Sequence, residues 1–365
     1  MTTTISLPST FDGIGYTRVG GGLPLETISV ALPKPGPSQV LIHVFWSSLN
    51  PLEYKLAQLN FMGRTPPVIL GFDLAGIVVE IGDDVRDFGI GDEVMAMADL
   101  NGDGGWATGG AGGFALARDF LTVRKPQSLG FREAAALPMC FLSAYAALQP
   151  SLREGDTIYI PGGGGGVGHL AVQMASRALG AARIISSGST SASRDLAQAS
   201  GAGWVFNYRV DDVAAEIMAL TEGEGVDLVY DTTYSETSFV ETAQMVRRGG
   251  TWIVLGVGPG KTTRTAETHS PVEGILAARS ASFINVNILR YFSEPARLNE
   301  AAMSFLRNGM HLAAACAAEG KVVPHVDKTI KGNAVEISDQ LAIMAKGTGN
   351  LGKIAVDLGS SHGAT

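Results

Sequence analysis

Five consecutive glycines at positions 162–166 have the clearest chemical use in this 365-residue chain. They follow an apolar, strand-like run at 157–160 and precede apolar residues that recur at helical spacing up to position 179. A glycine turn between a strand and a helix lets the backbone approach a dinucleotide pyrophosphate, and the helix N-terminus favours its negative charge. The spacing G-x-G-x-x-G fits this context and predicts a dinucleotide site. The predicted phosphate-binding residues are Gly163, Gly165, Gly166, Val167 and Gly168.

The residues after the second strand of such a fold distinguish NAD from NADP. An acidic residue there hydrogen-bonds the ribose 2′-hydroxyl and repels a 2′-phosphate. Here Ile185 is followed by a serine-rich run that reaches Arg194 without a carboxylate. Hydroxyl and guanidinium groups donate hydrogen bonds to phosphate, so we predict NADPH (NADP+) as the cofactor, bound by Ser187, Ser189, Arg194 and Tyr208. The alternative is that these hydroxyls only cap the helix that follows.

The order of predicted elements divides the chain into a β-rich part and an α/β part. Short strand-like runs separated by turn residues fill positions 25–125. After these, strands and helices alternate, which indicates a doubly wound parallel sheet covered on both faces. The tail 322–358 returns to strand-like runs around a helix at 334–346, and we expect it to close back on the first part. The α/β strands are predicted at 157–160, 182–187, 204–206, 226–230 and 251–255, and the helices at 167–179, 192–200, 211–221, 235–247 and 297–308.

The composition favours a protein with large buried cores, because 45% of its residues are hydrophobic and 17% are charged. The formal charge of −8 argues against a nucleic-acid partner, which requires clustered Lys and Arg. No run approaches the ~18 apolar residues of a membrane helix, and the start lacks the pattern of a secretion signal. Two cysteines, Cys140 and Cys316, cannot build a disulfide framework. We therefore expect a cytoplasmic protein with neither a nucleic-acid nor a membrane partner.

Several short segments, taken in order, carry a resemblance to a known family. They are residues 35–42, 50–55, 67–76, 89–94, 134–138, 165–168, 201–202, 225–231 and 352–354. Together they resemble the zinc-independent branch of the medium-chain dehydrogenase/reductase (MDR) superfamily, of the quinone oxidoreductase or zeta-crystallin type. The resemblance implies a GroES-like catalytic domain, from residues 1–130 and 321–365, around a Rossmann NADP(H)-binding domain of residues 131–320. It also implies a homodimer or dimer-based oligomer in which residues 282–288 pair as an edge strand.

The chain departs from the zinc-dependent members of this superfamily at their metal ligands. Those proteins carry Cys near position 48 and Gly-His-Glu where this chain has Gly71, Phe72 and Asp73. Ser48 replaces the thiolate and Phe72 the imidazole, and Cys140, near the remaining ligand position, cannot hold the ion alone. We therefore predict no metal. A hydride acceptor must then already be electrophilic, so the implied small-molecule substrate is a quinone or an activated C=C bond of an α,β-unsaturated carbonyl.

The resemblance also places residues beside the nicotinamide. Asn50, Tyr54 and Lys55 are expected there, with Lys55 or Tyr54 donating a proton or polarising the acceptor. The alternatives are packing for Tyr54 and a solvated helix charge for Lys55. Ser143 matches a Thr near the nicotinamide in relatives, unless it is an ordinary helix hydroxyl. Phe61, close to the catalytic Tyr of enoyl-thioester reductases, cannot donate a proton, which argues against a fatty-acid enoyl reductase. The other residues expected to line the nicotinamide pocket are Gly256, Val257 and Asn287.

Two other functions stay open at this point. One is an alcohol or carbonyl dehydrogenase of the same superfamily, with or without the assistance of a metal. The other is a non-catalytic, crystallin-like protein that binds NADPH. A motif at 99–104 resembles the start of a calcium loop, but its twelfth position, which must be Glu, is Gly110.

Overall fold

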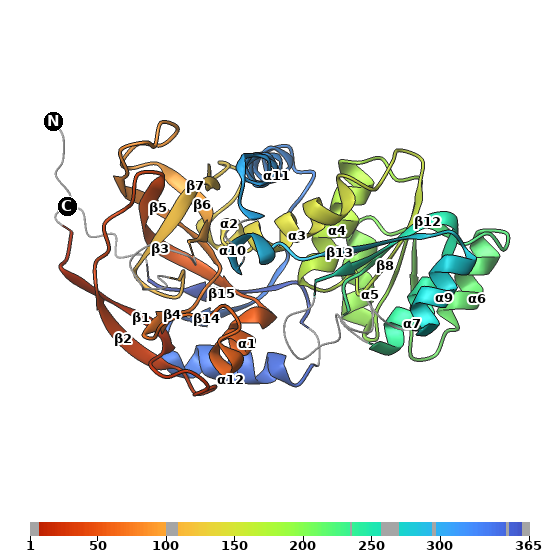
Figure 1. Ribbon diagram of the computed structural model, residues 1–365, viewed down its shortest axis with the longest axis horizontal. Helices are drawn as coiled ribbons and strands as arrows, with labels where there is room; N and C mark the ends of the chain where they lie inside the picture. The colour runs from red at the N-terminus through yellow and green to blue at the C-terminus, as the bar shows by residue number, and fades with distance from the viewer. Residues whose placement is uncertain are drawn as a thin grey trace.

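The computed structural model describes residues 7–99, 109–233, 236–256, 270–293, 297–347 and 350–359. Figure 1 shows two halves, one coloured red, orange and blue and the other mainly green to cyan. The first and last parts of the described chain therefore share one half, and the middle of the chain forms the other.

The half that contains both ends is built on a six-stranded sheet. Its strands in spatial order are β14 (Val326–Lys331), β15 (Lys353–Asp357), β3 (Gln39–Leu49), β5 (Asp73–Ile81), β6 (Glu93–Ala98) and β7 (Phe114–Arg124). Because β3 pairs with β7 as well as with β5, four of these strands close on themselves. A smaller antiparallel sheet contains β2 (Glu26–Ala31), β1 (Thr10–Tyr16) and β4 (Val68–Ile69). This arrangement confirms the predicted GroES-like part, with the tail completing its sheet.

The other half is a parallel sheet of the Rossmann type, as predicted. Its strands in spatial order are β10 (Trp204–Phe206), β9 (Arg183–Ser187), β8 (Thr157–Pro161), β11 (Val226–Asp231), β12 (Val246–Leu255) and β13 (Ser282–Val286). This is the doubly wound order in which the chain reverses direction beside its first strand, the usual place for a dinucleotide. β13 lies at one end of the sheet, and its pairing across a two-fold axis stays a prediction.

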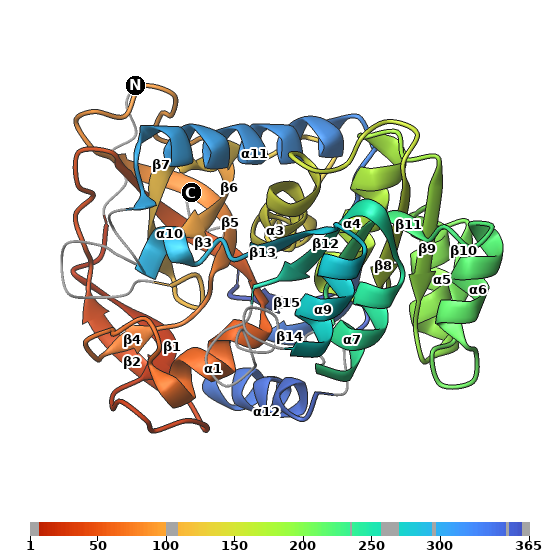
Figure 2. The same ribbon diagram turned by 45° about the vertical axis from the view of Figure 1, so that its right-hand side comes forward.

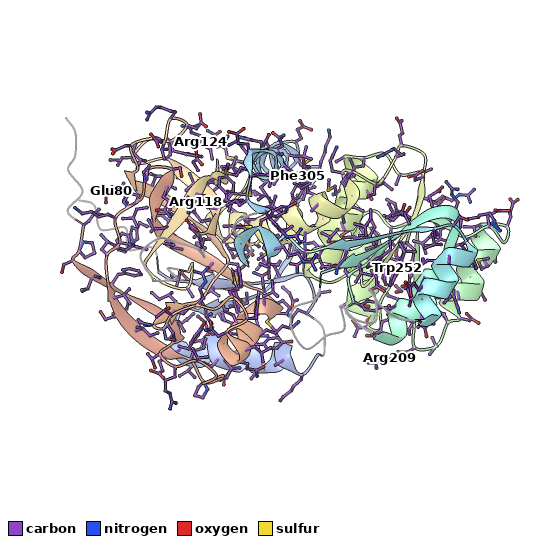
Figure 3. The ribbon with its side chains drawn as sticks, in the orientation of Figure 1. Glu80, Arg118, Arg124, Arg209, Trp252 and Phe305 are labelled. Carbon is purple, nitrogen blue, oxygen red and sulfur yellow. The ribbon has the colours of Figure 1, made fainter. Side chains whose placement is uncertain are left out.

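Helices cover both faces of this sheet (Figure 2). One face carries α3 (Pro138–Leu148), α4 (Gly166–Arg177) and α5 (Ser191–Ser200). The opposite face carries α6 (Val213–Leu220), α7 (Glu236–Gln244) and α9 (Ser270–Ala278). On that face Trp252, which Figure 3 labels, is fully buried and meets Phe239 edge to face. In the first half, α1 (Pro51–Leu59) packs against α12 (Ala334–Ala345). The short helices are α2 (Phe131–Ala134) and α10 (Arg290–Ser293).

A long helix, α11 (Glu300–Ala318), joins the two halves by packing on β7 and on α3. Its Phe305 ring lies 4.8 Å from the Tyr145 ring, centroid to centroid. One buried apolar cluster extends from the first sheet through α3 and α11 to α4. The two halves therefore share a continuous core, and the site between them has rigid walls.

Two element boundaries differ from the prediction. The helix predicted at 297–308 begins at Glu300 and continues to Ala318, and its Gly309 packs closely on α3: a Cβ there would lie 2.6 Å from Leu142 Cδ2. β12 begins at Val246 rather than 251, because Val246 already pairs with Val226 of β11, ahead of a shift in register. By contrast, Pro138 separates α2 from α3, as a proline at this point of the sequence indicates, and occupies the first helical position of α3, where its missing N–H costs nothing.

Among the described residues, no helix has both the length and the apolar character that crossing a membrane requires.

Candidate cofactor and active site

The glycine turn connects β8 to α4, as the sequence predicted, and its geometry depends on the missing side chains. Gly162 has a φ of +74°, which L-residues rarely adopt. A Cβ on Gly168 would collide with the carbonyl oxygen of Gly162, and one on Gly164 with the backbone of Ser193 in α5. Gly163 donates its N–H to Ser186 Oγ at 3.1 Å. The turn is thus closely packed against β9 and α5.

The N-terminus of α4 gives this turn its affinity for anions. Gly165 is the N-cap residue, and Gly166 and Val167 open the helix. The first N–H groups of an α-helix have no partner inside the helix, and they carry the positive end of its dipole. The predicted phosphate residues therefore form a site that fits a dinucleotide pyrophosphate.

The loop after β9 is less simple than its composition suggested. The Ser187 hydroxyl is buried and lies 2.9 Å from the Tyr159 hydroxyl, so it faces the sheet interior. Thr190 and Ser193 cap α5 reciprocally, as the capping alternative predicts. Arg194, half-buried, directs Nη1 to the Gly188 carbonyl oxygen at 3.4 Å.

The other groups predicted to bind the 2′-phosphate lie nearer the surface. Ser189 is half-buried and Tyr208 is 55% exposed. Arg209, next to Tyr208, lies at the edge of the Rossmann half in Figure 3. No acidic residue stands in the loop between β9 and α5. Nothing in the loop would therefore repel a 2′-phosphate, although fewer hydroxyls are available than predicted.

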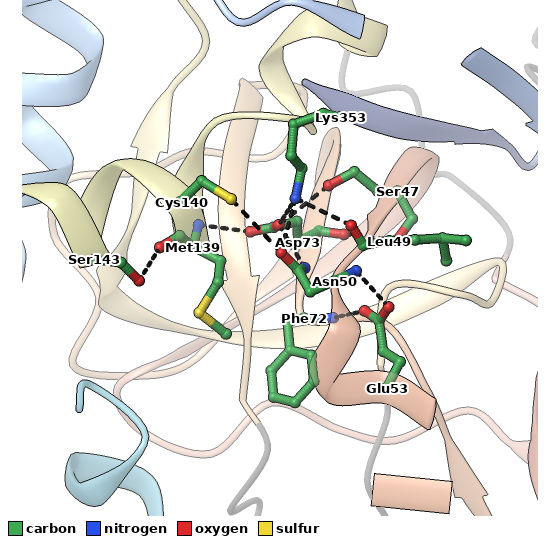
Figure 4. Close-up of polar contacts among 11 residues, drawn as sticks. Ser47, Leu49, Asn50, Glu53, Phe72, Asp73, Met139, Cys140, Ser143 and Lys353 are labelled. Carbon is green, nitrogen blue, oxygen red and sulfur yellow. Dashed lines mark hydrogen bonds and ion pairs between the residues drawn. The ribbon is translucent and has the colours of Figure 1, made fainter. Parts of the chain in front are cut away.

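A buried polar cluster of Ser48, Asn50, Asp73, Cys140 and Lys353 lies between the two halves (Figure 4 labels all but Ser48). Lys353 Nζ donates to Asn50 Oδ1 at 2.8 Å and to Asp73 Oδ2 at 3.2 Å. Its third contact is the Leu49 carbonyl oxygen at 3.3 Å. An ammonium carries three N–H donors, so these acceptors use all of them.

Asp73 connects the cluster to both halves of the molecule. Its Oδ2 also accepts from Asn50 Nδ2 at 2.9 Å and from Ser48 Oγ at 3.1 Å. Its Oδ1 accepts the backbone N–H of Met139 at 2.7 Å, in the first turn of α3. Cys140, the next residue, places its Sγ 3.8 Å from Asn50 Oδ1. The Asn50 side chain is therefore held at both ends of its amide.

The cluster does not fit the zinc site that zinc-dependent members of the superfamily contain. Zinc requires at least three nitrogen, sulfur or carboxylate ligands with their lone pairs free. Here Asp73 is bound to Lys353, and burial raises the pKa of Cys140, which keeps the thiol protonated. No group of three or more His, Cys, Asp and Glu suited to a metal occurs among the described residues. The ammonium of Lys353 supplies the positive charge between these groups instead.

Glu53 adds a second buried carboxylate beside this cluster. It accepts the backbone N–H of Asn50 at 2.6 Å and that of Phe72 at 3.3 Å, which fixes the start of α1 next to β5. Burial raises its pKa to about 8, against the lowering effect of these N–H groups and of Lys353. Burial alone lowers the pKa of Lys353, but the neighbouring acidic groups, with the bound Asp73 carboxylate among them, outweigh it and raise the pKa. Lys353 thus stays charged.

The other predicted residues occupy varied surroundings. Lys55 is buried, so the solvated alternative for it is wrong. Tyr54 is half-buried and packs on the core, and burial raises its pKa. The Ser143 hydroxyl donates to the Met139 carbonyl oxygen at 2.8 Å, as an ordinary helix hydroxyl does.

Gly256 follows β12 and its N–H donates to the Val286 carbonyl oxygen, beside Asn287. Val257 lies outside the described residues.

Comparison with known proteins agrees with this architecture. Residues 36–127 match the family described as alcohol dehydrogenase GroES-like domain, and residues 166–306 the family described as zinc-binding dehydrogenase. Human quinone oxidoreductase is 30% identical over 62% of this chain and 67% of its own length. The 2-methylene-furan-3-one reductase of Solanum lycopersicum is 32% identical over 69% of this chain and 64% of its own length.

The chain belongs to the MDR family of the quinone oxidoreductase type. It spans about two thirds of the length of these two relatives. Quinone oxidoreductase of Escherichia coli, solved in complex with NADPH, has the same fold with a TM-score of 0.78 at 20% identity, covering 95% of this chain and 99% of that one. Oxidoreduction with a nicotinamide cofactor is the chemistry of this family.

Sequence reasoning missed the roles of Lys353 and Glu53. Lys353 lies within the segment 352–354 that carried the family resemblance, but its meeting with Asp73 spans 280 positions of the chain. Glu53 was detectable, because Asn50 with Glu53 three residues later is a capping-box spacing.

Replacing Gly168 with Ala is expected to weaken binding of NADPH at least about tenfold, because the added Cβ pushes α4 away from Gly162. Quenching of protein fluorescence on titration measures this. Gly274→Ala in α9 is the control: its Cβ meets nothing within 4 Å, so binding should be unchanged and the helix stabilised by up to about 1 kcal/mol. Unchanged affinity in Gly168→Ala would contradict the assigned turn.

Replacing Lys353 with Met is expected to lower the free energy of unfolding by about 3–5 kcal/mol, because it leaves the Asp73 carboxylate buried without its counter-charge. The double variant Lys353→Met with Asp73→Asn should recover much of that loss. Urea denaturation of the three proteins measures both effects. Equal losses in the single and double variants would show that the two charges are not coupled.

Proposed function

We propose that this protein is an NADPH-dependent, metal-independent reductase that delivers hydride to a quinone or to the activated C=C bond of an α,β-unsaturated carbonyl. The observation that carries the proposal is the buried polar cluster. Its cation, Lys353, uses its donors on Leu49, Asn50 and Asp73 and has none left for a substrate oxygen. With this cation committed, the cluster offers neither a metal nor a free ammonium to polarise a carbonyl oxygen, so it favours acceptors that are electrophilic by themselves.

When bound, the cofactor supplies the hydride. The chain binds and orients it: the N-terminus of α4 holds the pyrophosphate, and the loop after β9 takes the 2′-phosphate, with Arg194 as its charged donor. Asn50, whose amide is fixed by Lys353 and Asp73, is the rigid polar group beside the nicotinamide ring. The enolate or phenolate that forms must be protonated, and α1 presents Tyr54 and Lys55 for this step. Since burial raises the pKa of Tyr54, it keeps its proton at neutral pH.

The names of similar proteins support the same class of acceptor. The human relative is a quinone oxidoreductase, and the tomato relative is a reductase of an enone. A further relative in Arabidopsis thaliana is an NADPH-dependent alkenal/one oxidoreductase. A non-catalytic, NADPH-binding role and an alcohol dehydrogenase activity are the alternatives that the assay must distinguish.

The test is oxidation of NADPH, followed at its absorbance band, with a panel of quinones, enones and enoyl thioesters. Saturated ketones and aldehydes of matched size serve as unconjugated controls. We expect turnover with at least one conjugated acceptor, none with the controls, and no effect of a chelator. Binding of NADPH without turnover of any acceptor would favour the non-catalytic role, and chelator-sensitive oxidation of alcohols would favour the dehydrogenase.

Preference for NADPH is expected to depend on Arg194. Arg194→Ala removes a charge-assisted hydrogen bond worth about 1.5–3 kcal/mol, so the Kd of NADPH should rise about 10- to 100-fold while that of NADH stays the same. Arg183→Ala is the matched control, since Arg183 lies at the opposite end of β9 and donates to Leu220. Tighter binding of NADH than of NADPH by the unmodified protein would overturn the assignment.

A further inference from the structure

A stripe of polar residues on α4 holds the segment through which the chain returns from the Rossmann half to the first half. We call residues 321–325 the return link. His169, Gln173 and Arg177 are four residues apart and lie on one face of the helix. Gln173 exchanges two hydrogen bonds with the backbone of Val323, at 2.8 and 3.0 Å, and Arg177 Nη1 donates to the Lys321 carbonyl oxygen at 3.4 Å.

His169 differs from the other two because it touches both the return link and the glycine turn. Its side chain is fully buried. Nδ1 lies 2.8 Å from the Gly165 carbonyl oxygen, and Nε2 lies 3.0 Å from the backbone nitrogen of His325. A carbonyl oxygen only accepts and a backbone N–H only donates, so the proton must sit on Nδ1 and the lone pair on Nε2. A second proton, on Nε2, would point its N–H at the backbone N–H of His325 and break this hydrogen bond.

The contact with Gly165 bears directly on phosphate binding. The Gly165 carbonyl accepts from the backbone N–H of His169 at 3.0 Å and also from its ring. In a trans peptide the C=O and the next N–H point in opposite directions. Fixing this carbonyl therefore aims the Gly166 N–H out of the helix, towards the site of the pyrophosphate.

The return link closes a circuit around the same turn. The His325 carbonyl oxygen accepts the backbone N–H of Lys353 at 2.8 Å. The preceding residue, Gly352, donates its N–H to the Gly164 carbonyl oxygen at 2.8 Å. Hydrogen bonds thus lead from Gly165 through His169 and the return link to β15, and from β15 back to the turn.

We propose that His169 is a positioning residue that sets the orientation of the phosphate-binding turn relative to the first half of the protein. It acts through Gly165 and His325 and holds its neutral form, so it contributes geometry rather than charge to the anion site. This inference rests on the proposed binding of NADPH at the turn. Burial lowers the pKa of His169 to about 4, in keeping with a ring whose two nitrogens are both committed.

The experiment compares His169→Leu with Gln173→Leu, which lies on the same face one turn further along and contacts the return link but not the glycine turn. Both variants should lose stability. Only His169→Leu should weaken NADPH, by about tenfold, whereas Gln173→Leu should stay within about twofold. His169→Asn, whose amide nitrogen replaces Nδ1, should restore most of the affinity. Equal effects in the two Leu variants, or no rescue by Asn, would overturn the proposal.

Amide hydrogen exchange in the protein without cofactor separates this inference from the proposed function. Exchange at residues 164–168 should be faster in His169→Leu than in Gln173→Leu, whether or not NADPH proves to be the cofactor. If the unmodified protein binds no nicotinamide dinucleotide, the proposed function fails, and the exchange pattern alone decides the role of His169. Equal exchange in the two variants would refute that role.

The pH dependence of unfolding provides a third measurement. The unfolded chain protonates His169 below about pH 6.5, its ordinary value, but the folded chain resists protonation until about pH 4. The unfolded state therefore binds more protons in this interval, and stability falls as the pH drops through it. His169→Asn cannot titrate, so its loss of stability between pH 6.5 and 4 should be shallower. Identical acid profiles would show that the ring is not held neutral.

Discussion

The buried ammonium of Lys353 is the constraint on which the rest of the site depends. A charge without water is tolerated only when every donor finds an acceptor and an opposite charge is near. Here the acceptors are supplied by the end of β3, the residue before α1, and β5. Asp73 in turn accepts a hydrogen bond from the backbone N–H of Met139 in the first turn of α3. One charge thus fixes the last strand of the chain, the start of α1 and the helix that leads into the Rossmann half.

This arrangement explains how one architecture serves two chemistries. A bound metal exchanges a water for a substrate oxygen and so activates a carbonyl directly. An ammonium whose three N–H groups are already used keeps the same positive charge in the scaffold but offers no open position. In the proposed function, the buried polar cluster therefore offers no electrophile to the substrate. The reactivity then comes from the acceptor, and the protein contributes orientation and a proton.

The sequence predicted the features that depend on neighbouring residues. The glycine turn, the alternation of strands and helices, and the capping hydroxyls of Thr190 and Ser193 are all local. The sequence did not show contacts between segments that are distant along the chain. Ser187 was predicted to bind the cofactor, yet its hydroxyl lies within hydrogen-bond distance of Tyr159 on the adjacent strand. The packing of Gly309 against α3 is another such contact. The pairing of Asp73 with Lys353 depends on the closure of the first sheet by the tail, which local patterns do not encode.

The segment at the start of β15 links the two ends of the site. Gly352 has a φ of +51°, and a Cβ there would lie 2.8 Å from the His325 ring, so only glycine allows its N–H to reach the turn at Gly164. The side chain of Lys353, the next residue, lies in the buried polar cluster and donates a hydrogen bond to Asn50. Two consecutive residues therefore bind the glycine turn through the backbone and the buried polar cluster through the side chain. Because the two residues are adjacent in the chain, the glycine turn and the buried polar cluster are linked through the start of β15, and a displacement of the turn would be transmitted to the cluster.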